Sequence, residues 1–297
     1  MRDVVLIPAW RRPEMLVHCL LNIMRAEEAD RLHYIFRFDQ GHSAELYDAI
    51  KVSGFAFSHE ITQTPRTYYR IAKQSFSLLT GYHLAAQKSL KLVYMIEEDV
   101  MVGTDFFRWH REVHEANPQL FCSSAVANPN RHVKVHGELE EYYLTTADYC
   151  SLGVCFSKDM LIKHVLPAAT QKYYVNPIDE CKRQFPTSPF GSSFAEQDGL
   201  IRRVQWRLGL EHPIAYPYRA RAYHAGLYGK NRGQGPTGSL EKRLQYVADI
   251  IYSDEAMRTF AKHPEWYEDS KPINLSTPPW TTLQLKPLDL QANPARA

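Results

Sequence analysis

Long apolar runs are absent from this 297-residue sequence. A membrane-spanning helix needs roughly 20 consecutive apolar residues, and no stretch of the chain approaches that length. The N-terminal segment is also unlike a signal peptide, because its short apolar stretch is interrupted by Pro8. These absences predict a soluble protein of the cytoplasm that makes no contact with a membrane.

Cysteine is scarce as well. The chain contains five cysteines, an odd number, and no Cys-x-x-Cys motif. This pattern argues against a disulfide-stapled fold and against a zinc cluster, since both need cysteines at regular spacing. Cys150 and Cys155 are close enough in sequence to pair, but reduced structural thiols in a reducing compartment are the favoured interpretation.

Neither sign of charge dominates the composition. The formal net charge is +2, so bulk charge indicates no particular partner. Hydrophobic residues make up 44% of the chain and charged residues 23%, which argues against disordered and fibrous classes. The length fits one large α/β domain or a catalytic domain with a small appendage, and no repeat or linker divides the chain.

Strand and helix patterns alternate over the first third of the chain. We expect buried strands at residues 4–8, 33–38, 54–61 and 92–96, and helices at 14–26, 44–52 and 70–88. This order predicts a largely parallel sheet, and such sheets bind ligands beyond the carboxyl ends of their strands. Asp39 follows one of these strands, and the acidic triplet Glu97, Glu98 and Asp99 follows another. Both are therefore expected on one rim of the sheet.

The pattern becomes irregular after residue 130. Residues 142–146 and 153–156 are strand-like, 197–208 and 239–262 are helical, and 216–238 form a loop rich in Gly, Tyr, Arg and Lys. The proline-rich residues from 270 onward look like an extended surface tail.

The acidic triplet suggests a metal site. Adjacent carboxylates repel one another unless a cation or a donor satisfies them. Oxygen ligands suit Mg²⁺ or Mn²⁺, which often bind substrate phosphates at the same time. The plainer alternative is a solvated acidic turn, but the rim position of the triplet favours function.

Three segments resemble GT-A fold glycosyltransferases. Residues 5–13 (VLIPAWRRP) resemble their first strand and turn, residues 38–42 (FDQGH) their nucleotide-contacting turn, and residues 95–100 (MIEEDV) their metal motif. Together they are closest to the N-acetylglucosaminyltransferase I family, which transfers N-acetylglucosamine with inversion, and the similarity runs over residues 4–229. It implies a GT-A-like (Rossmann-like) α/β fold with a mostly parallel sheet flanked by helices. Within one continuous catalytic domain, residues 1–130 would bind the nucleotide sugar and residues 131–297 would form an irregular acceptor-side half.

The resemblance also implies roles for single residues. Asp99 matches the acid that coordinates Mn²⁺ or Mg²⁺, and Asp39 matches the acid that recognises the base, usually uracil, so a UDP-sugar is the expected donor. The positions implied for donor binding are Pro8, Ala9, Arg12, Asp39, Tyr68, Glu97, Glu98 and His224. Two of them depart from the family pattern: Glu98 stands where the family has a ribose-binding Asp, and Tyr68 where it has a His.

Asp198 is the candidate catalytic base, and Glu196 is its rival. Both lie at the start of the helix expected at 197–208, where acids are also favoured simply by the helix dipole. Inverting transfer needs one carboxylate to take the acceptor proton, and Asp198 matches the family's base. The late His224 precedes a glycine-rich loop suited to closing over a donor, although a single His is more often an ordinary packed residue.

Residues 202–243 contain nine Lys or Arg and two acids, interleaved with aromatic residues. This excess suits a donor diphosphate, or a DNA acceptor whose exposed base is a hydroxymethylated one of the kind found in some phages. A solvated face is equally compatible with it. A glycan or protein hydroxyl is the alternative acceptor.

Two other classes of function remain as alternatives. A nucleotidyltransferase would share the α/β layout, but it usually begins with a glycine-rich phosphate loop, whereas the turn at residues 8–12 has no glycine. A non-catalytic nucleotide-sugar-binding module would keep Asp39 and Asp99 but have no need of Asp198. The sequence therefore favours an inverting, metal-dependent glycosyltransferase.

Overall fold

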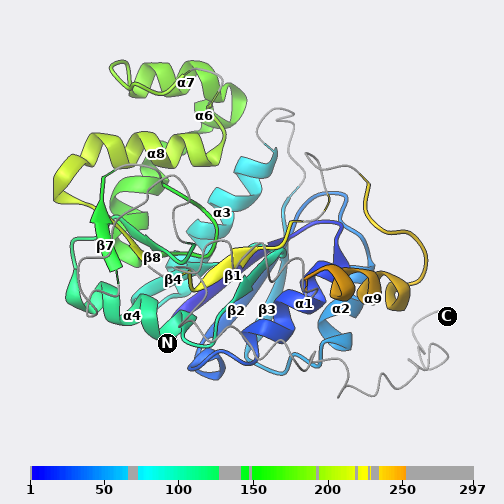
Figure 1. Ribbon diagram of the computed structural model, residues 1–297. Helices are drawn as coiled ribbons and strands as arrows, with labels where there is room; N and C mark the ends of the chain where they lie inside the picture. The colour runs from blue at the N-terminus through cyan, green and yellow to red at the C-terminus, as the bar shows by residue number, and fades with distance from the viewer. Residues whose placement is uncertain are drawn as a thin grey trace.

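Figure 1 shows the computed structural model, which describes residues 2–65, 73–126, 142–146, 149–191, 194–217, 220–226, 228 and 234–251. The strands are β1 Val4–Ala9, β2 His33–Phe38, β3 His59–Gln63, β4 Leu92–Met95, β5 Val100–Val102, β6 Cys122–Ser124, β7 Tyr142–Thr145, β8 Val154–Ser157, β9 Ile214–Pro217 and β10 Ala222–His224. The longer helices are α1 Pro13–Ile23, α2 Glu45–Val52, α3 Lys73–Lys88, α4 Phe106–Ala116, α7 Pro177–Gln184, α8 Gln197–Leu208 and α9 Leu240–Ile251. The short helices are η1 Ala29–Arg31, α5 Lys158–Met160, η2 Leu161–Val165, η3 Leu166–Ala168, α6 Gln171–Val175 and η4 Gly209–Glu211.

The central sheet has eight strands in the order β3-β2-β1-β4-β8-β6-β9-β7. The first four are mutually parallel, as the alternation of strands and helices predicts. β8 then pairs antiparallel with both β4 and β6, β6 runs parallel to β9, and β7 closes the edge antiparallel to β9. The predicted α/β class, with a large, mostly parallel sheet flanked by helices, is confirmed.

Both faces of this sheet are buried, which explains why β1 is apolar throughout. Val5 and Ile7 pack in one core cluster with α1, α2 and α4, whereas Val4 and Leu6 pack in a second cluster with α3 and α8. A strand covered by helices on both faces needs a continuous apolar run and not an alternating one. The carboxyl ends of these strands thus lie on a rigid two-sided core.

The third strand was predicted at residues 54–61 and is observed at His59–Gln63, so it begins later than predicted. Pairing begins only at His59, because the apolar residues before it pack their rings on β2 and do not join the sheet. The rings of Phe55 and Tyr34 meet edge to face at 4.9 Å, and Phe57 stacks on Tyr34 at 6.0 Å. Helix α3 begins, among described residues, at Lys73.

The second half is more regular than the sequence suggested. The segment at 216–238, expected to be a loop, includes the end of β9 and all of β10, and the Pro- and Tyr-rich segment before residue 191 forms α6 and α7. Figure 1 shows α6, α7 and α8 projecting together beyond the sheet. The suggested boundary at 130/131 lies outside the described residues, and strands from both sides of it belong to one sheet.

All five cysteines are free, so Cys150 and Cys155 do not pair, as expected for reduced thiols. Burial raises the pKa of the Cys19, Cys122 and Cys155 thiols, which keeps them protonated and unreactive. Over the part of the chain that the structure covers, no helix combines the length and apolar character needed to cross a bilayer.

Candidate functional site

The acidic triplet, Glu97, Glu98 and Asp99, lies where β4 leaves the central sheet. The backbone turns sharply here, since the Val100 amide donates to the Glu97 carbonyl at 2.9 Å. The chain then enters β5, which pairs antiparallel with β10 in a separate two-stranded sheet. This small sheet sets Val100 opposite His224 and so brings a residue from late in the sequence to the triplet.

Arg12 binds two of the three acids. Its Nε donates to Glu98 Oε1 at 2.6 Å, and its Nη1 donates to Asp99 Oδ2 at 2.5 Å. The other Glu98 oxygen accepts from the Trp10 amide at 2.8 Å. The turn after β1 is therefore fastened to the turn after β4. The family resemblance implied that Arg12 contacts the donor, and the structure places its guanidinium on the acids.

His224 completes the surroundings of Asp99. Its Nε2 lies 3.0 Å from Asp99 Oδ2, and the following amide, that of Ala225, donates to the Asp99 carbonyl at 2.8 Å. Gly226 packs so closely that a Cβ there would collide with the His224 ring and crowd Asp99. This close approach explains the glycine and holds the imidazole beside the carboxylate.

The electrostatics of the triplet are uneven. Burial raises the pKa of Glu97 to about 8, helped by repulsion from Asp99 and Asp198, and raises that of Glu98 to about 7 despite Arg12. Burial also acts to raise the pKa of Asp99, but His224 and Arg12 outweigh it and hold that pKa below its ordinary value. Asp99 is therefore the member of the triplet that stays ionised.

The residues around Asp99 offer part of a metal site. Asp99 Oδ1 is buried and has no hydrogen-bond partner among the described residues, while His224 Nε2 lies beside Oδ2. Within the described ranges, no group of three or more His, Cys, Asp or Glu side chains is arranged to hold an ion. Asp99 and His224 fit a cation whose remaining ligands come from water and substrate phosphates, which is the usual behaviour of Mg²⁺.

Asp39 lies on the same rim, as predicted, at the end of β2, and β1 lies between β2 and β4. Its amide donates to the Ala9 carbonyl at 3.0 Å, so it stands beside the end of β1, which contains Pro8 and Ala9. Its Oδ1 accepts from the Gln40 amide at 2.7 Å, and burial raises its pKa. Tyr68, the remaining position suggested for the donor, lies outside the described residues.

Asp198 approaches the triplet from helix α8. Ser151 Oγ donates to Asp198 Oδ2 at 3.4 Å, and Oδ1 is buried without a partner among the described residues. Burial raises the pKa of Asp198, against the opposing influence of Arg202 and Ser151. Asp198 in turn contributes to the raised pKa of Glu97, so the two carboxyls lie within electrostatic reach. Glu196, the rival acid, is exposed and precedes the first turn of α8.

The structure also shows a chain of polar contacts, here called the latch, that joins Tyr228 to helices α1, α9 and α2. The sequence did not suggest it. The Tyr228 hydroxyl donates to Glu14 of α1, and Glu14 pairs with Arg243 of α9 at 3.1 Å. Arg243 continues to Glu45 at 2.5 Å. No local signal marks these partners, because they are separated by up to 229 positions and Glu14 resembles an ordinary acid of a first helical turn.

Most of the arginine side chains described in the basic stretch at 202–243 already contact other groups of the protein. Arg221 pairs with Asp105 at 2.8 Å, and Arg243 with two glutamates. The arginines of α8 bind backbone carbonyls or lie over rings, namely Arg202 at the Tyr149 carbonyl, Arg203 at the Phe194 carbonyl and Arg207 over Phe185. Arg219, Lys230 and Arg232 lie outside the described residues.

Comparison with known proteins finds similarity only among solved structures, since no family model and no curated protein match this sequence. One similar structure is the mannosyltransferase PcManGT from Pyrobaculum calidifontis in complex with GDP-Man and Mn²⁺, at 13% identity and a TM-score of 0.35, covering 43% of this chain and 36% of that one. Another is S. aureus TarS 1–349, at 9% identity and a TM-score of 0.47, covering 85% of this chain and 64% of that one. The same fragment in complex with UDP-GlcNAc matches at 8% identity, with a TM-score of 0.47.

This chain therefore spans less than two thirds of the mannosyltransferase chain and of the TarS fragment named first. None of these structures links it to the N-acetylglucosaminyltransferase I family in particular. At such low identities and TM-scores, we base the functional argument on the side chains of the rim.

Proposed function

We propose that this protein is a metal-dependent, inverting glycosyltransferase that moves a sugar from a nucleotide-sugar donor, expected to be a UDP-sugar, to a hydroxyl acceptor. One observation carries the proposal: two carboxylates from distant parts of the chain, Asp99 and Asp198, each keep a buried oxygen that has no hydrogen-bond partner among the described residues. Both acids raise the pKa of Glu97, so Glu97 lies within electrostatic reach of each of them. Buried, unsatisfied carboxylates are costly, so their retention supports a role in binding and chemistry.

The donor would lie along the rim from Asp39 to Asp99. Asp39 and the turn at Pro8 and Ala9 are proposed to receive the nucleoside, while Asp99 and His224 hold Mn²⁺ or Mg²⁺ with the diphosphate. Such an ion supplies charge neutralisation for the departing diphosphate. Arg12, already bound to Glu98 and Asp99, holds both acids in place and helps to keep Asp99 ionised in the absence of other cations.

Asp198 is proposed as the general base. As the acceptor oxygen bonds to the anomeric carbon, its proton moves to Asp198. The bond from that carbon to the diphosphate oxygen breaks, and its electron pair leaves with the nucleotide. A base works best when its pKa lies near the working pH, and burial moves the pKa of Asp198 upward in that direction. Ser151 orients the carboxylate through Oδ2 and leaves Oδ1 for the acceptor.

A hydroxymethylated base in DNA is the acceptor suggested by the basic stretch. Nucleic-acid binding needs cations that are available to phosphates. Arg203, Arg221 and Arg243 already bind carbonyls or carboxylates, so this hypothesis now depends on the exposed Arg207 and Lys242 and on residues 219, 230 and 232. A glycan or protein hydroxyl is the second candidate, and its support is the exposed aromatic ring of Phe194, described in the next subsection.

A donor-hydrolysis screen tests the proposed function without knowledge of the acceptor. UDP-, GDP- and other nucleotide sugars are incubated with the protein in Mn²⁺, and release of the nucleotide diphosphate is measured. We expect one donor class to be hydrolysed, with the activity lost in EDTA and in Asp99→Ala. Asp48→Ala, on helix α2 away from the rim, is the matched control and should retain hydrolysis.

Two results would contradict the proposal. Hydrolysis by Asp99→Ala at the wild-type rate would remove the metal assignment. Failure to hydrolyse or bind any nucleotide sugar, with a folded protein, would remove the glycosyltransferase assignment. Transfer to DNA containing 5-hydroxymethylcytosine, assayed beside a panel of saccharides, distinguishes the two candidate acceptors.

A further inference from the structure

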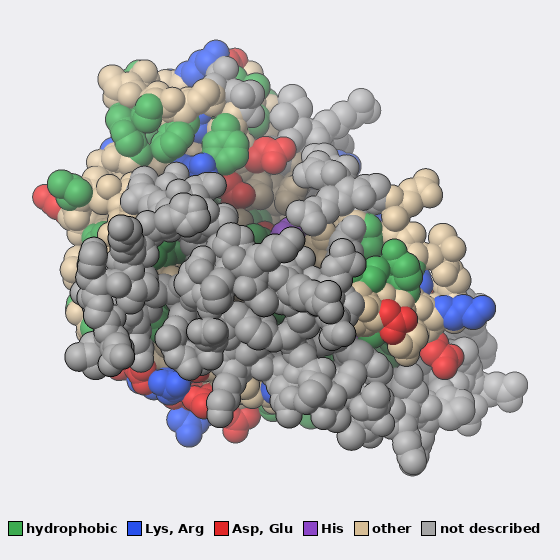
Figure 2. Space-filling view, in the orientation of Figure 1, with side chains coloured by type: hydrophobic (Ala, Val, Ile, Leu, Met, Phe, Trp, Pro, Cys, Tyr) green, Lys and Arg blue, Asp and Glu red, His purple; other side chains and the backbone are tan. Residues whose placement is uncertain are grey.

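An exposed aromatic side chain precedes the helix that carries Asp198. Phe194 is 38% exposed, although phenylalanine is a residue that folding normally buries. It belongs to a group of exposed apolar residues at this end of the molecule, with Val175 of α6 and Ile178 of α7. Figure 2 shows hydrophobic side chains gathered over this end, next to acidic ones.

The backbone of Phe194 is held firmly in place. Arg203, itself only 2% exposed, donates from Nη1 to the carbonyls of both Phe194 and Gly199. Its Nη2 donates to the Gly191 carbonyl at 2.8 Å. The Phe194 carbonyl lies so close to Gly199 that a Cβ there would not fit. Because Asp198 and Gly199 share the first turn of α8, Phe194 has a fixed position beside the proposed base.

Arg202 connects the aromatic ring to the base. Its guanidinium lies over the Phe194 ring at 5.1 Å from the centroid, and it donates to the Tyr149 carbonyl at 2.9 Å. Arg202 stands one helical turn after Asp198, and its positive charge acts on that carboxyl. The cation thus braces the ring while its own donors are bound to the backbone.

We propose that Phe194, braced by Arg202, is a stacking platform for the ring of a saccharide acceptor, holding its hydroxyl toward Asp198. This proposal rests on the proposed function and names its acceptor class. The apolar C–H face of a pyranose can cover the exposed aromatic surface, which gains the free energy of burying both.

The surrounding charges favour a saccharide over a nucleotide strand. A DNA acceptor would bring phosphates to the same place, and these need cations that are available to solvent. The arginines nearest to the platform, Arg202 and Arg203, already donate to backbone carbonyls. A neutral ring needs no such cation, so the immediate surroundings of Phe194, where both arginines are bound to carbonyls, fit a saccharide better.

Saccharide binding tests the platform directly. Methyl glycosides of glucose, galactose, mannose and N-acetylglucosamine are presented to the full-length protein, and binding is measured by saturation-transfer NMR with UDP and Mn²⁺ present. We expect wild type to bind at least one glycoside and Phe194→Ala to bind it about tenfold more weakly, the loss expected when one aromatic contact is removed. Phe194→Tyr, which keeps the ring, should restore binding.

Trp206→Ala is the matched control. Trp206 is also a partly exposed aromatic residue of α8, at 36%, but it lies about 12 Å further along the helix axis from Asp198. Its removal should leave glycoside binding unchanged. Thermal denaturation of each variant verifies that the fold is retained, and an unfolded Phe194→Ala would be replaced by Phe194→Leu.

The outcomes separate this proposal from the proposed function. Equal binding by wild type and Phe194→Ala, or transfer with an unchanged acceptor KM, would overturn the platform while glycosyl transfer stands. Binding that depends on Phe194 in a protein that turns over no nucleotide sugar would keep the platform and overturn the proposed function. No glycoside binding by wild type, together with transfer to hydroxymethylated DNA, would also overturn the saccharide assignment.

Discussion

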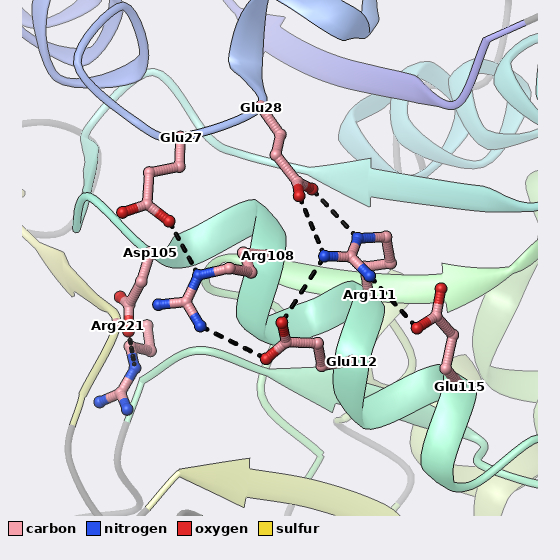
Figure 3. A network of polar contacts seen from close by, with 8 residues as sticks. All are labelled: Glu27, Glu28, Asp105, Arg108, Arg111, Glu112, Glu115 and Arg221. Atoms are coloured by element: carbon pink, nitrogen blue, oxygen red, sulfur yellow. Dashed lines mark hydrogen bonds and ion pairs between the residues drawn. The ribbon is translucent and has the colours of Figure 1, made fainter.

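Two clusters of charged side chains use the same residue types in opposite ways. On helix α4, Arg108 and Arg111 pair with glutamates from the same helix and from the chain that follows α1 (Figure 3). We call this cluster the α4 network; its acids are Glu27, Glu28, Glu112 and Glu115, and its side chains are 22–64% exposed. In the acidic triplet, the Glu98 and Asp99 side chains are only 5% and 3% exposed.

The difference lies in how completely the protein satisfies its own charge. Each acid of the α4 network reaches an arginine in solvent, where an ion pair contributes about 0–1 kcal/mol. In the triplet, Arg12 pairs with two of the three carboxylates, Glu98 and Asp99, and burial raises the pKa of Glu97 and Glu98. The exposed, paired charges of the α4 network are those of a structural surface. The buried acids of the triplet outnumber their cations, as expected of a site where a bound ligand supplies the missing positive charge.

The largest effect is expected from Asp198, because its Oδ1, like that of Asp99, is buried without a partner among the described residues. Asp198→Asn keeps the shape but cannot accept a proton, so glycosyl transfer should fall by roughly 10² to 10⁴ while nucleotide binding persists. Transfer kinetics and nucleotide titration measure the two effects. Glu196→Gln is the control, and an inactive Glu196→Gln beside an active Asp198→Asn would reverse the assignment.

Removing the cation of the triplet should cost stability. Arg12→Gln leaves two buried carboxylates without their ion pair, and we expect the free energy of unfolding to fall by about 2–4 kcal/mol in metal-free buffer. Mn²⁺ should restore part of this loss if it binds at Asp99. Urea unfolding with and without Mn²⁺ provides the measurement, and an equal loss in both buffers would count against metal binding there.

The pH dependence of stability sharpens the same contrast. The folded-state pKa values of Glu97 and Glu98 lie at about 8 and 7, above their ordinary 4.5. Folding therefore favours their protonated forms, and their stabilising effect is complete below pH 4.5 and lost as the pH rises to about 8. In metal-free buffer, Glu97→Gln should unfold with a smaller decline in Tm over this interval than wild type. An identical decline would show that Glu97 titrates normally.

The smallest effect is expected in the α4 network. Arg111→Gln removes its ion pairs with Glu28 and Glu115, but these groups remain hydrated. The free energy of unfolding should fall by less than about 1 kcal/mol, and high salt should reduce the difference further. A loss as large as that of Arg12→Gln would erase the distinction between the two clusters.

Contiguous features of the chain were predictable from sequence. The apolar run at 33–38 and the helix at 197–208 coincide with β2 and α8, and the rim positions of Asp39 and the triplet follow from strand ends. The β5–β10 pairing was not predictable, because it joins two three-residue strands whose partners, Val102 and Ala222, are far apart in sequence. Asp99 and His224 were therefore each singled out from the sequence, but their contact was not predicted.

The aromatic platform at Phe194 and the latch could not be predicted from sequence, for a related reason. The position of Phe194 depends on four backbone carbonyls that Arg203 binds, and no periodicity of the sequence reveals such a contact. Tyr228 and Glu14 likewise meet only in the folded chain. The basic composition of 202–243 suggested available cations, but several of those side chains hold the protein together.

The contacts of Asp99 with Arg12 and His224 have a consequence for how the chain folds. Its partners lie 87 positions before it and 125 positions after it, so both contacts close very long loops. Contacts of such separation form late, after local segments have already paid much of their ordering entropy. A nascent chain that has emerged only as far as β5 holds the three neighbouring acids and lacks His224. The surroundings of Asp99 are thus complete only after β10 has been synthesised and has paired with β5.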